Sequence, residues 1–294
     1  MKPAPFQYLA PTTVDEAIAA LTEHGDDAKL LAGGQSLIPT MNFRLAQPAV
    51  LIDLNRIPDL GYITPTGAGG LRIGAMTRQR QVERSTEVAE RAPLLAAAMP
   101  NIAHVQIRNR GTVGGSLAHA DPAAELPAVL LALDGSVVVR GPTGERRISM
   151  RDLYVGLFAT DLMPNEMLTE VELPPRPARS GFAVQEVARR QGDYALVGVA
   201  LQVEMDAKER CLDARIAYFS VGEGPVMATS ATAMLIGERP SSALLEAAAH
   251  QAAQVDLDPP GDIHASARFR RHLAQVLGRR ALTEAFERAG VIVA

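Results

Sequence analysis

The sequence has a single cysteine, Cys211, no tryptophan and only three lysines among 294 residues. One cysteine excludes an internal disulfide, an all-cysteine iron–sulfur cluster and a multi-cysteine zinc site. The cysteine lies in an apolar stretch, where we expect an inert, buried thiol. Any metal chemistry that involves this protein is therefore expected in another chain.

Long apolar runs and blocks of like charge are also missing. No run of about 18 apolar residues occurs, and the first residues, Met1-Lys2-Pro3-Ala4-Pro5-Phe6, lack the apolar core of a signal peptide. The net charge is -4, with acidic and basic residues mixed along the chain, which argues against a nucleic-acid partner. We expect a cytoplasmic protein without an integral membrane segment, either free or peripheral to the inner face of the membrane.

The length and the 47% hydrophobic content suit two or three cores. Near the N-terminus, strand-like stretches flank a helix that opens on a capping box, Thr13 with Glu16, and stops at Gly25. A further apolar strand at 50–54 completes a small α/β unit over residues 1–60.

A larger α+β unit is expected over residues 61–175. A glycine-rich turn, 67–70, divides a hairpin, and helical apolar spacing covers 79–99 and 123–133. Between these helices, the polar and glycine-containing stretch 104–121 is a candidate functional loop. Further strands are expected at 137–139, 146–148 and 167–173.

The proline-rich stretch 174–177 is the clearest linker in the sequence. After it, three strand-like stretches are followed by two helical ones. The strands are expected at 182–189, 197–205 and 212–220, and the helices at 241–253 and 264–289. This order predicts a separate domain, residues 176–294, in which helices cover a three-stranded antiparallel sheet.

Two glycine-rich segments have the chemistry that a diphosphate needs. The first, Ala32-Gly33-Gly34-Gln35-Ser36, follows a strand and offers consecutive backbone N–H groups, no β-carbon at its glycines and a hydroxyl donor. The second, Thr112-Val113-Gly114-Gly115-Ser116, repeats this chemistry with two hydroxyls. Alone, either segment is equally well explained as a Gly-Gly turn. Neither has the spacing of a Walker A loop or of a Rossmann dinucleotide fingerprint, so another class of nucleotide-binding fold is required.

The two segments stand within longer motifs that resemble the flavin signatures of the carbon monoxide dehydrogenase medium subunit, in the xanthine dehydrogenase family. The motifs are Leu30-Leu31-Ala32-Gly33-Gly34-Gln35-Ser36-Leu37 and Ile107-Arg108-Asn109-Arg110-Gly111-Thr112-Val113-Gly114-Gly115-Ser116-Leu117-Ala118-His119-Ala120-Asp121-Pro122, about eighty residues apart. Two further stretches, 165–171 and 189–195, also resemble family segments. The resemblance implies an α+β fold: a two-part FAD-binding domain of the PCMH and VAO type, a small βαβ unit plus a larger α+β unit, followed by the C-terminal domain.

The resemblance also implies roles for single residues. Both glycine-rich segments would line FAD, and Glu125 would bond its adenosine end, although a charge at a helix N-terminus explains Glu125 as well. Ile102 and Leu168 would give apolar contacts, or belong simply to the core.

Residues of the C-terminal domain and the first segment complete this set. Gln185 takes the place of a lysine found near the flavin in some relatives, and Tyr194, after Asp193, would bring a ring to the isoalloxazine or only pack at a strand start. Gln35 stands where covalently flavinylated relatives of the wider fold carry histidine, so the resemblance implies non-covalent FAD.

The resemblance predicts an oxidoreductase subunit rather than a complete enzyme. This chain would hold FAD and no catalytic or metal-ligating residue, while a molybdopterin large subunit and a [2Fe–2S] small subunit complete a heterotrimer that dimerises. FAD would accept electrons from the clusters and pass them to an external acceptor, and selectivity for the reducing substrate would lie in the molybdenum subunit. The alternatives are a free-standing FAD oxidase or dehydrogenase and a non-redox nucleotide-binding assembly protein.

Overall fold

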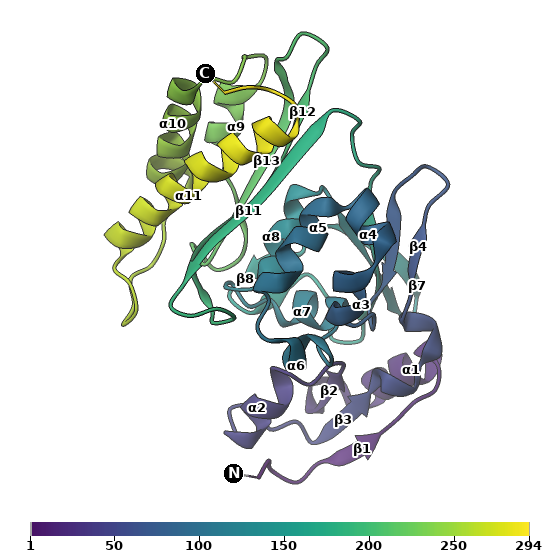
Figure 1. Ribbon diagram of the computed structural model, residues 1–294. Coiled ribbons are helices and arrows are strands. Elements are labelled where there is room, and N and C mark those ends of the chain that lie inside the picture. The colour runs from purple at the N-terminus through teal and green to yellow at the C-terminus, as the bar shows by residue number, and fades with distance from the viewer. Residues whose placement is uncertain (1, 294) are drawn as a thin grey trace.

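Three larger β-sheets follow one another along the chain in the computed structural model, which describes residues 2–293 (Figure 1). We call the parts built on them the N-terminal, central and C-terminal units. Within residues 2–293, no helix is both long and apolar enough to cross a membrane.

The N-terminal unit has a parallel sheet in the order β1-β3-β2. Its strands are β1 (Gln7–Leu9), β2 (Ala28–Leu31) and β3 (Val50–Asp53), and its helices are α1 (Val14–His24) and α2 (Leu37–Asn42). The predicted capping box opens α1, because Thr13 Oγ1 accepts from the Glu16 N–H at 3.2 Å and the Glu16 carboxylate accepts from the Thr13 N–H at 3.3 Å. The predicted small βαβ unit is therefore present.

The central unit has an antiparallel sheet in the order β4-β5-β10-β6-β7. Its strands are β4 (Ile63–Pro65), β5 (Leu71–Gly74), β6 (Ser136–Gly141), β7 (Gly144–Ser149) and β10 (Met167–Leu173). The hairpin predicted around the turn at 67–70 forms as β4 and β5. The strands predicted at 137–139 and 146–148 also pair as a hairpin, β6 and β7. A separate pair of short strands, β8 (Tyr154–Gly156) and β9 (Ala159–Thr160), was not expected from the sequence.

The helical stretch predicted at 79–99 is divided into three helices, α3 (Gln79–Arg84), α4 (Thr86–Arg91) and α5 (Pro93–Ala98). The breaks fall at Ser85, with ψ 123°, and at Ala92, with ψ 59°. Proline disfavours the helical conformation of the residue before it, which accounts for the second break. The other helices of this unit are α6 (Val105–Arg108), α7 (Val113–His119) and α8 (Glu125–Ala132), and every residue of α8 is buried.

The C-terminal unit has an antiparallel sheet in the order β11-β12-β13-β14. Its strands are β11 (Ser180–Ala188), β12 (Ala195–Met205), β13 (Cys211–Phe219) and β14 (Val226–Met227). The first three are those predicted, and the two-residue β14 corrects the expected number from three to four. The helices α9 (Thr229–Leu235), α10 (Ser242–Gln251) and α11 (Ala267–Arg288) cover one face of this sheet, whereas α5 and α8 of the central unit pack on the other (Figure 1).

Candidate functional site

The two glycine-rich segments, which the sequence separates, lie in contact. We call residues 32–36 the first glycine segment and residues 112–116 the second. A β-carbon at Gly33 would stand 2.5 Å from the Arg110 carbonyl oxygen, just before the second segment. One at Gly115 would stand 3.2 Å from the Ala32 β-carbon. Glycine at these positions therefore lets the two backbones approach more closely than other residues allow.

The first glycine segment is an open loop between β2 and α2. Within residues 2–293, no protein oxygen accepts a hydrogen bond from the backbone N–H groups of Gly33, Gly34, Gln35 or Ser36. Gly34 has a φ of +74°, a conformation that residues with a side chain rarely adopt. Consecutive free N–H groups at such a turn are typical of anion-binding surfaces, and that this segment binds a diphosphate stays a prediction.

The second glycine segment is not a loop, and here the prediction was wrong. Thr112 caps α7, and the segment forms the first turn of that helix. The Val113 and Gly114 N–H groups donate to Thr77 and Ala75 carbonyls at 3.1 and 2.8 Å, and those of Gly115 and Ser116 donate to Thr112 Oγ1 and the Thr112 carbonyl at 3.1 and 3.2 Å. Because these donors are satisfied within the protein, this segment contributes close packing and the Ser116 hydroxyl, not a second set of free N–H groups.

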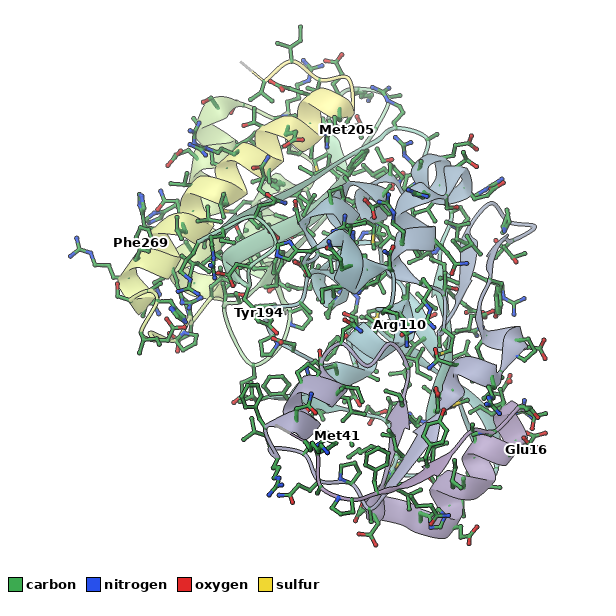
Figure 2. The ribbon with its side chains drawn as sticks, turned by 60° about the horizontal axis from the view of Figure 1, so that its bottom comes forward. Glu16, Met41, Arg110, Tyr194, Met205 and Phe269 are labelled. Atoms are coloured by element: carbon green, nitrogen blue, oxygen red, sulfur yellow. The ribbon has the colours of Figure 1, made fainter. Side chains whose placement is uncertain are left out.

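Two polar residues that sequence reasoning missed link the segments. Asn55 Nδ2 donates to the Ala32 carbonyl at 3.0 Å. The Arg78 guanidinium donates to Asn55 Oδ1 and to the Arg110 carbonyl, the same oxygen that Gly33 approaches. Burial, and secondarily the charge of Arg110, holds the pKa of Arg78 below its usual value. Figure 2 shows Arg110 where the central unit faces the N-terminal unit. No motif marks Asn55 or Arg78, because their positions depend on the packing of two units.

A second group of titratable residues lies between the central and C-terminal units. Glu125, 8% exposed, begins α8, and burial raises its pKa to about 7, with the charge of Asp121 adding to the effect. Glu186, from β11, faces it: burial raises the pKa of this carboxyl to about 8, and the Glu125 charge contributes. Within the described residues, Glu186 Oε2 is buried and has no hydrogen-bond partner.

Tyr194, from the C-terminal unit, lies near this group. The tyrosine is 67% exposed, yet its pKa is raised because its hydroxyl end is partly shielded from water and lies near the Asp121 and Glu125 carboxylates. The structure therefore brings Glu125 and Tyr194 together from two units.

Gln185 is not part of this group. Its Nε2 donates to Glu284 Oε2 of α11 at 2.6 Å, on the helix-covered face of the C-terminal sheet. Successive side chains of a strand point to opposite faces, and Phe182 and Val184 pack against the central core whereas Ala183 and Val187 pack against the helices. The residue of β11 that faces Glu125 is thus Glu186.

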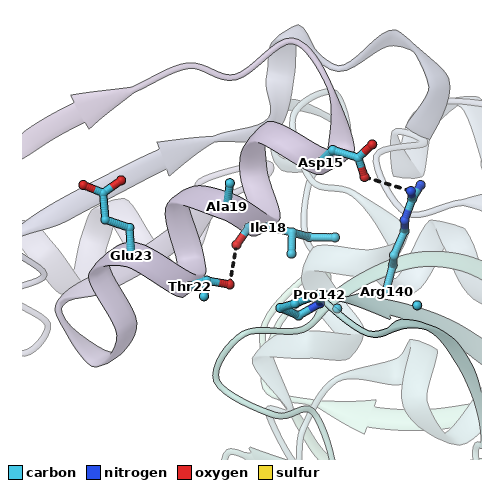
Figure 3. Close-up of a pocket in the computed structure, with 9 residues that line it drawn as sticks. Asp15, Ile18, Ala19, Thr22, Glu23, Arg140 and Pro142 are labelled. Atoms are coloured by element: carbon cyan, nitrogen blue, oxygen red, sulfur yellow. Dashed lines mark hydrogen bonds and ion pairs between the residues drawn. The ribbon is translucent and has the colours of Figure 1, made fainter.

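Ile102 and Leu168 are buried in the central core, 7% and 5% exposed. This location agrees with the simpler explanation that both are packing residues. His119 stacks on Phe158 with ring centroids 5.4 Å apart, and Cys211 is buried, which raises the pKa of its thiol to about 12. A shallow groove between α1 and the β6–β7 turn, with an Asp15–Arg140 ion pair of 2.8 Å at its edge (Figure 3), contains none of the predicted site residues.

Comparison with known proteins agrees with this architecture over nearly the whole chain. Residues 4–176 match the family model of the FAD binding domain in molybdopterin dehydrogenase, and residues 182–285 match that of the CO dehydrogenase flavoprotein C-terminal domain. The chain is 43% identical to the 6-hydroxypseudooxynicotine dehydrogenase complex subunit alpha of Paenarthrobacter nicotinovorans, over 98% of this chain and 97% of the relative. It is 37% identical to the carbon monoxide dehydrogenase medium chain of Hydrogenophaga pseudoflava, over 98% and 99% of the two chains.

Solved structures give the same result. A carbon monoxide dehydrogenase chain from Hydrogenophaga pseudoflava superposes with a TM-score of 0.95 at 38% identity, covering 98% of this chain and 99% of that chain. A chain of quinoline 2-oxidoreductase from Pseudomonas putida 86 superposes with a TM-score of 0.93, also at 38% identity, covering 99% and 100%. Fold and sequence together define a flavoprotein component of an oxidoreductase. The chain belongs to the family of FAD-binding subunits of molybdopterin dehydrogenases that includes the carbon monoxide dehydrogenase medium chains.

Proposed function

We propose that this chain is the FAD-binding electron-transfer subunit of a molybdenum hydroxylase complex. In this proposal it takes electrons from [2Fe–2S] clusters of a partner subunit and passes them to an external acceptor. The observation that carries the proposal is the first glycine segment, which contacts the region of the second segment and has four backbone N–H groups without an acceptor among the described residues. An anion with several acceptor oxygens, such as the FAD diphosphate, satisfies all four at once.

The residues present fit FAD. Gly33 to Ser36 would hold the diphosphate through backbone N–H groups, and the Ser36 and Ser116 hydroxyls, which have no bonds to described residues, are available as further donors. Bound flavin supplies the redox chemistry, since it accepts electrons singly and delivers them in pairs. Gln35 already donates its Nε2 to the Gly33 carbonyl at 3.0 Å and its amide is not a nucleophile, which supports non-covalent binding.

The remaining predicted residues would act on the rest of the cofactor. Glu125 would accept a hydrogen bond from its adenosine end, and Tyr194 would bring a ring from the C-terminal unit. Ile102 and Leu168 would support the site from the core beneath it. Gln185 faces α11 in this structure, so its contribution would require a different side-chain arrangement in the bound state.

The proposed partners are a molybdopterin large subunit and a [2Fe–2S] small subunit, assembled as a dimer of heterotrimers in the cytoplasm. The names of two relatives support the presence of partner subunits, since one is a subunit of a dehydrogenase complex and the other is a medium chain. The reducing substrate would then be selected by the molybdenum subunit and not by this chain.

The decisive experiment uses the protein purified with its native partners. The visible spectrum is recorded, the protein is precipitated with acid, and the released nucleotide and the metal content are determined. We expect free FAD in the supernatant together with iron–sulfur absorbance and molybdenum. A preparation that takes up no flavin even after reconstitution would overturn the proposal in favour of a non-redox nucleotide-binding protein. A flavin-loaded chain that oxidises substrate without molybdenum would instead identify a free-standing oxidase or dehydrogenase.

A further inference from the structure

The Arg78 side chain lies where the first glycine segment contacts the backbone just before the second. Its Nη1 donates to the Arg110 carbonyl, which contacts Gly33, and its Nη2 donates to Asn55 Oδ1. Asn55 in turn donates to the Ala32 carbonyl at 3.0 Å. The guanidinium is therefore joined to the N-terminal unit through a side chain and to the central unit through a backbone carbonyl.

The charge of this guanidinium is not balanced within the protein. Both of its acceptors are neutral, and within residues 2–293 neither Arg78 nor Arg110 forms an ion pair, whereas the more deeply buried Arg108 pairs with Glu83. The negative charge of Asp53 acts on both arginines. The Asp53 carboxylate, however, already accepts hydrogen bonds from the Tyr8 hydroxyl and the Asn55 N–H. A half-buried cation without a counter-charge is unfavourable unless an anion joins it.

We propose that Arg78 and Arg110 bind the FAD diphosphate, supplying two positive charges to the doubly negative group whose oxygens the first glycine segment holds. This inference rests on the function proposed above and names charged residues of the same site. Arg78 also has a positioning role, because its bond to the Arg110 carbonyl holds that backbone against Gly33. Arg110, whose side chain is exposed and makes no hydrogen bond to described residues, contributes charge alone.

The test compares ligands that do and do not contain a diphosphate. FAD, ADP and riboflavin are titrated into the flavin-free full-length chain and into its Arg78→Gln and Arg110→Gln variants, at low and high salt. Arg239→Gln is the matched control, because Arg239 is exposed, makes no bond to described residues and lies in the C-terminal unit. Arg78→Lys, which keeps the charge but not the two-point hydrogen bonding, completes the set.

We expect Arg78→Gln to weaken FAD and ADP binding by the same factor, on the order of 10- to 100-fold, as for loss of a charge-assisted hydrogen bond. Riboflavin binding should stay unchanged, the salt dependence of FAD binding should become shallower, and Arg78→Lys should restore part of the affinity. Arg110→Gln should give the same pattern with a smaller factor.

The possible failures are distinguishable. If the wild-type chain binds FAD while both glutamine variants bind it as the Arg239→Gln control does, the charge assignment is wrong and the proposed function stands. If the Arg78 variant weakens riboflavin as much as FAD and Arg110→Gln changes nothing, the residues are structural and the assignment again fails. If the wild-type chain binds neither FAD nor ADP, the proposed function and this inference fall together.

Discussion

Glu125 is buried and Glu186 is half-buried between two units, near enough for the Glu125 charge to raise the Glu186 pKa, so their ionisation should weaken the folded chain. Each folded-state pKa, about 8 and about 7, lies above the ordinary value of 4.5. A raised carboxyl pKa means that the folded state binds the proton more tightly than the unfolded state. The stability that the protonated forms of these carboxyls give the folded state is therefore complete below pH 4.5. It is lost progressively as the pH rises from 4.5 to about 7 for Glu125 and to about 8 for Glu186.

The magnitude follows from the shifts. One pKa unit corresponds to about 1.4 kcal/mol, so the shift of Glu186 sets an upper limit of roughly 5 kcal/mol. Solvent reaches part of this side chain, and screening reduces the expected effect to about 2 kcal/mol. Glu186→Gln removes the charge and keeps the shape, so we expect its free energy of unfolding to exceed the wild-type value by about 2 kcal/mol at pH 9. At pH 4, where Glu186 is largely protonated in both the folded and the unfolded state, the two proteins should differ little.

Urea denaturation of the flavin-free chain at both pH values measures this difference. Glu145→Gln is the control, since Glu145 lies on β7 with an exposed side chain that makes no hydrogen bond or ion pair to described residues. It should leave the stability unchanged at both pH values. A Glu186→Gln variant whose advantage is the same at pH 4 and pH 9, or which is less stable than wild type at pH 9, would refute the reasoning.

Two further variants test contacts near the glycine segments. Gly33→Ala places a β-carbon against the Arg110 carbonyl. From an overpacking cost of about 1–3 kcal/mol, we expect it to weaken FAD binding, measured by flavin fluorescence, by about 5- to 100-fold. Gly67→Ala, with open space around it, should bind FAD normally, and equal FAD affinities of the two variants would contradict the proposed contact. Glu83→Gln leaves the buried Arg108 guanidinium without its carboxylate and should cost about 3–5 kcal/mol in urea denaturation. Glu87→Gln, which breaks an exposed pair, should cost about 0.5 kcal/mol or less.

The fold was largely predictable because its signals are local. The capping box at Thr13, the hairpin turns and the alternating apolar strands each depend on a few neighbouring residues. The division of the stretch 79–99 was missed because its apolar spacing continues across Ser85 and Ala92, while their backbone angles do not. The edge strand β14 is too short to give a periodic signal.

Sequence reasoning did not reveal those neighbours of the site that depend on tertiary structure. Gln185 and Glu186 are adjacent, and the spacing of the family resemblance selected Gln185, which bonds Glu284 of α11. Because side chains alternate along a strand, Glu186 instead lies on the side of Glu125. The apolar neighbours Phe182 and Val184 share the face of Glu186. A period-two reading of this strand would therefore have pointed to Glu186.

The two glycine segments show why a chemical pattern alone does not define a binding surface. Both contain two glycines followed closely by a serine, yet among the described residues only the first segment keeps its N–H groups free of protein acceptors. In the second, the β-branched Thr112 adopts an extended conformation and caps α7, while the end of β5 brings the Ala75 and Thr77 carbonyls to the remaining donors. In the first, Gly34 turns with positive φ and Ser36 makes no capping bond, so no protein acceptor competes with an anion. The proposed division of roles, with one segment that binds the diphosphate and one that supports it, thus follows from which carbonyls each segment meets.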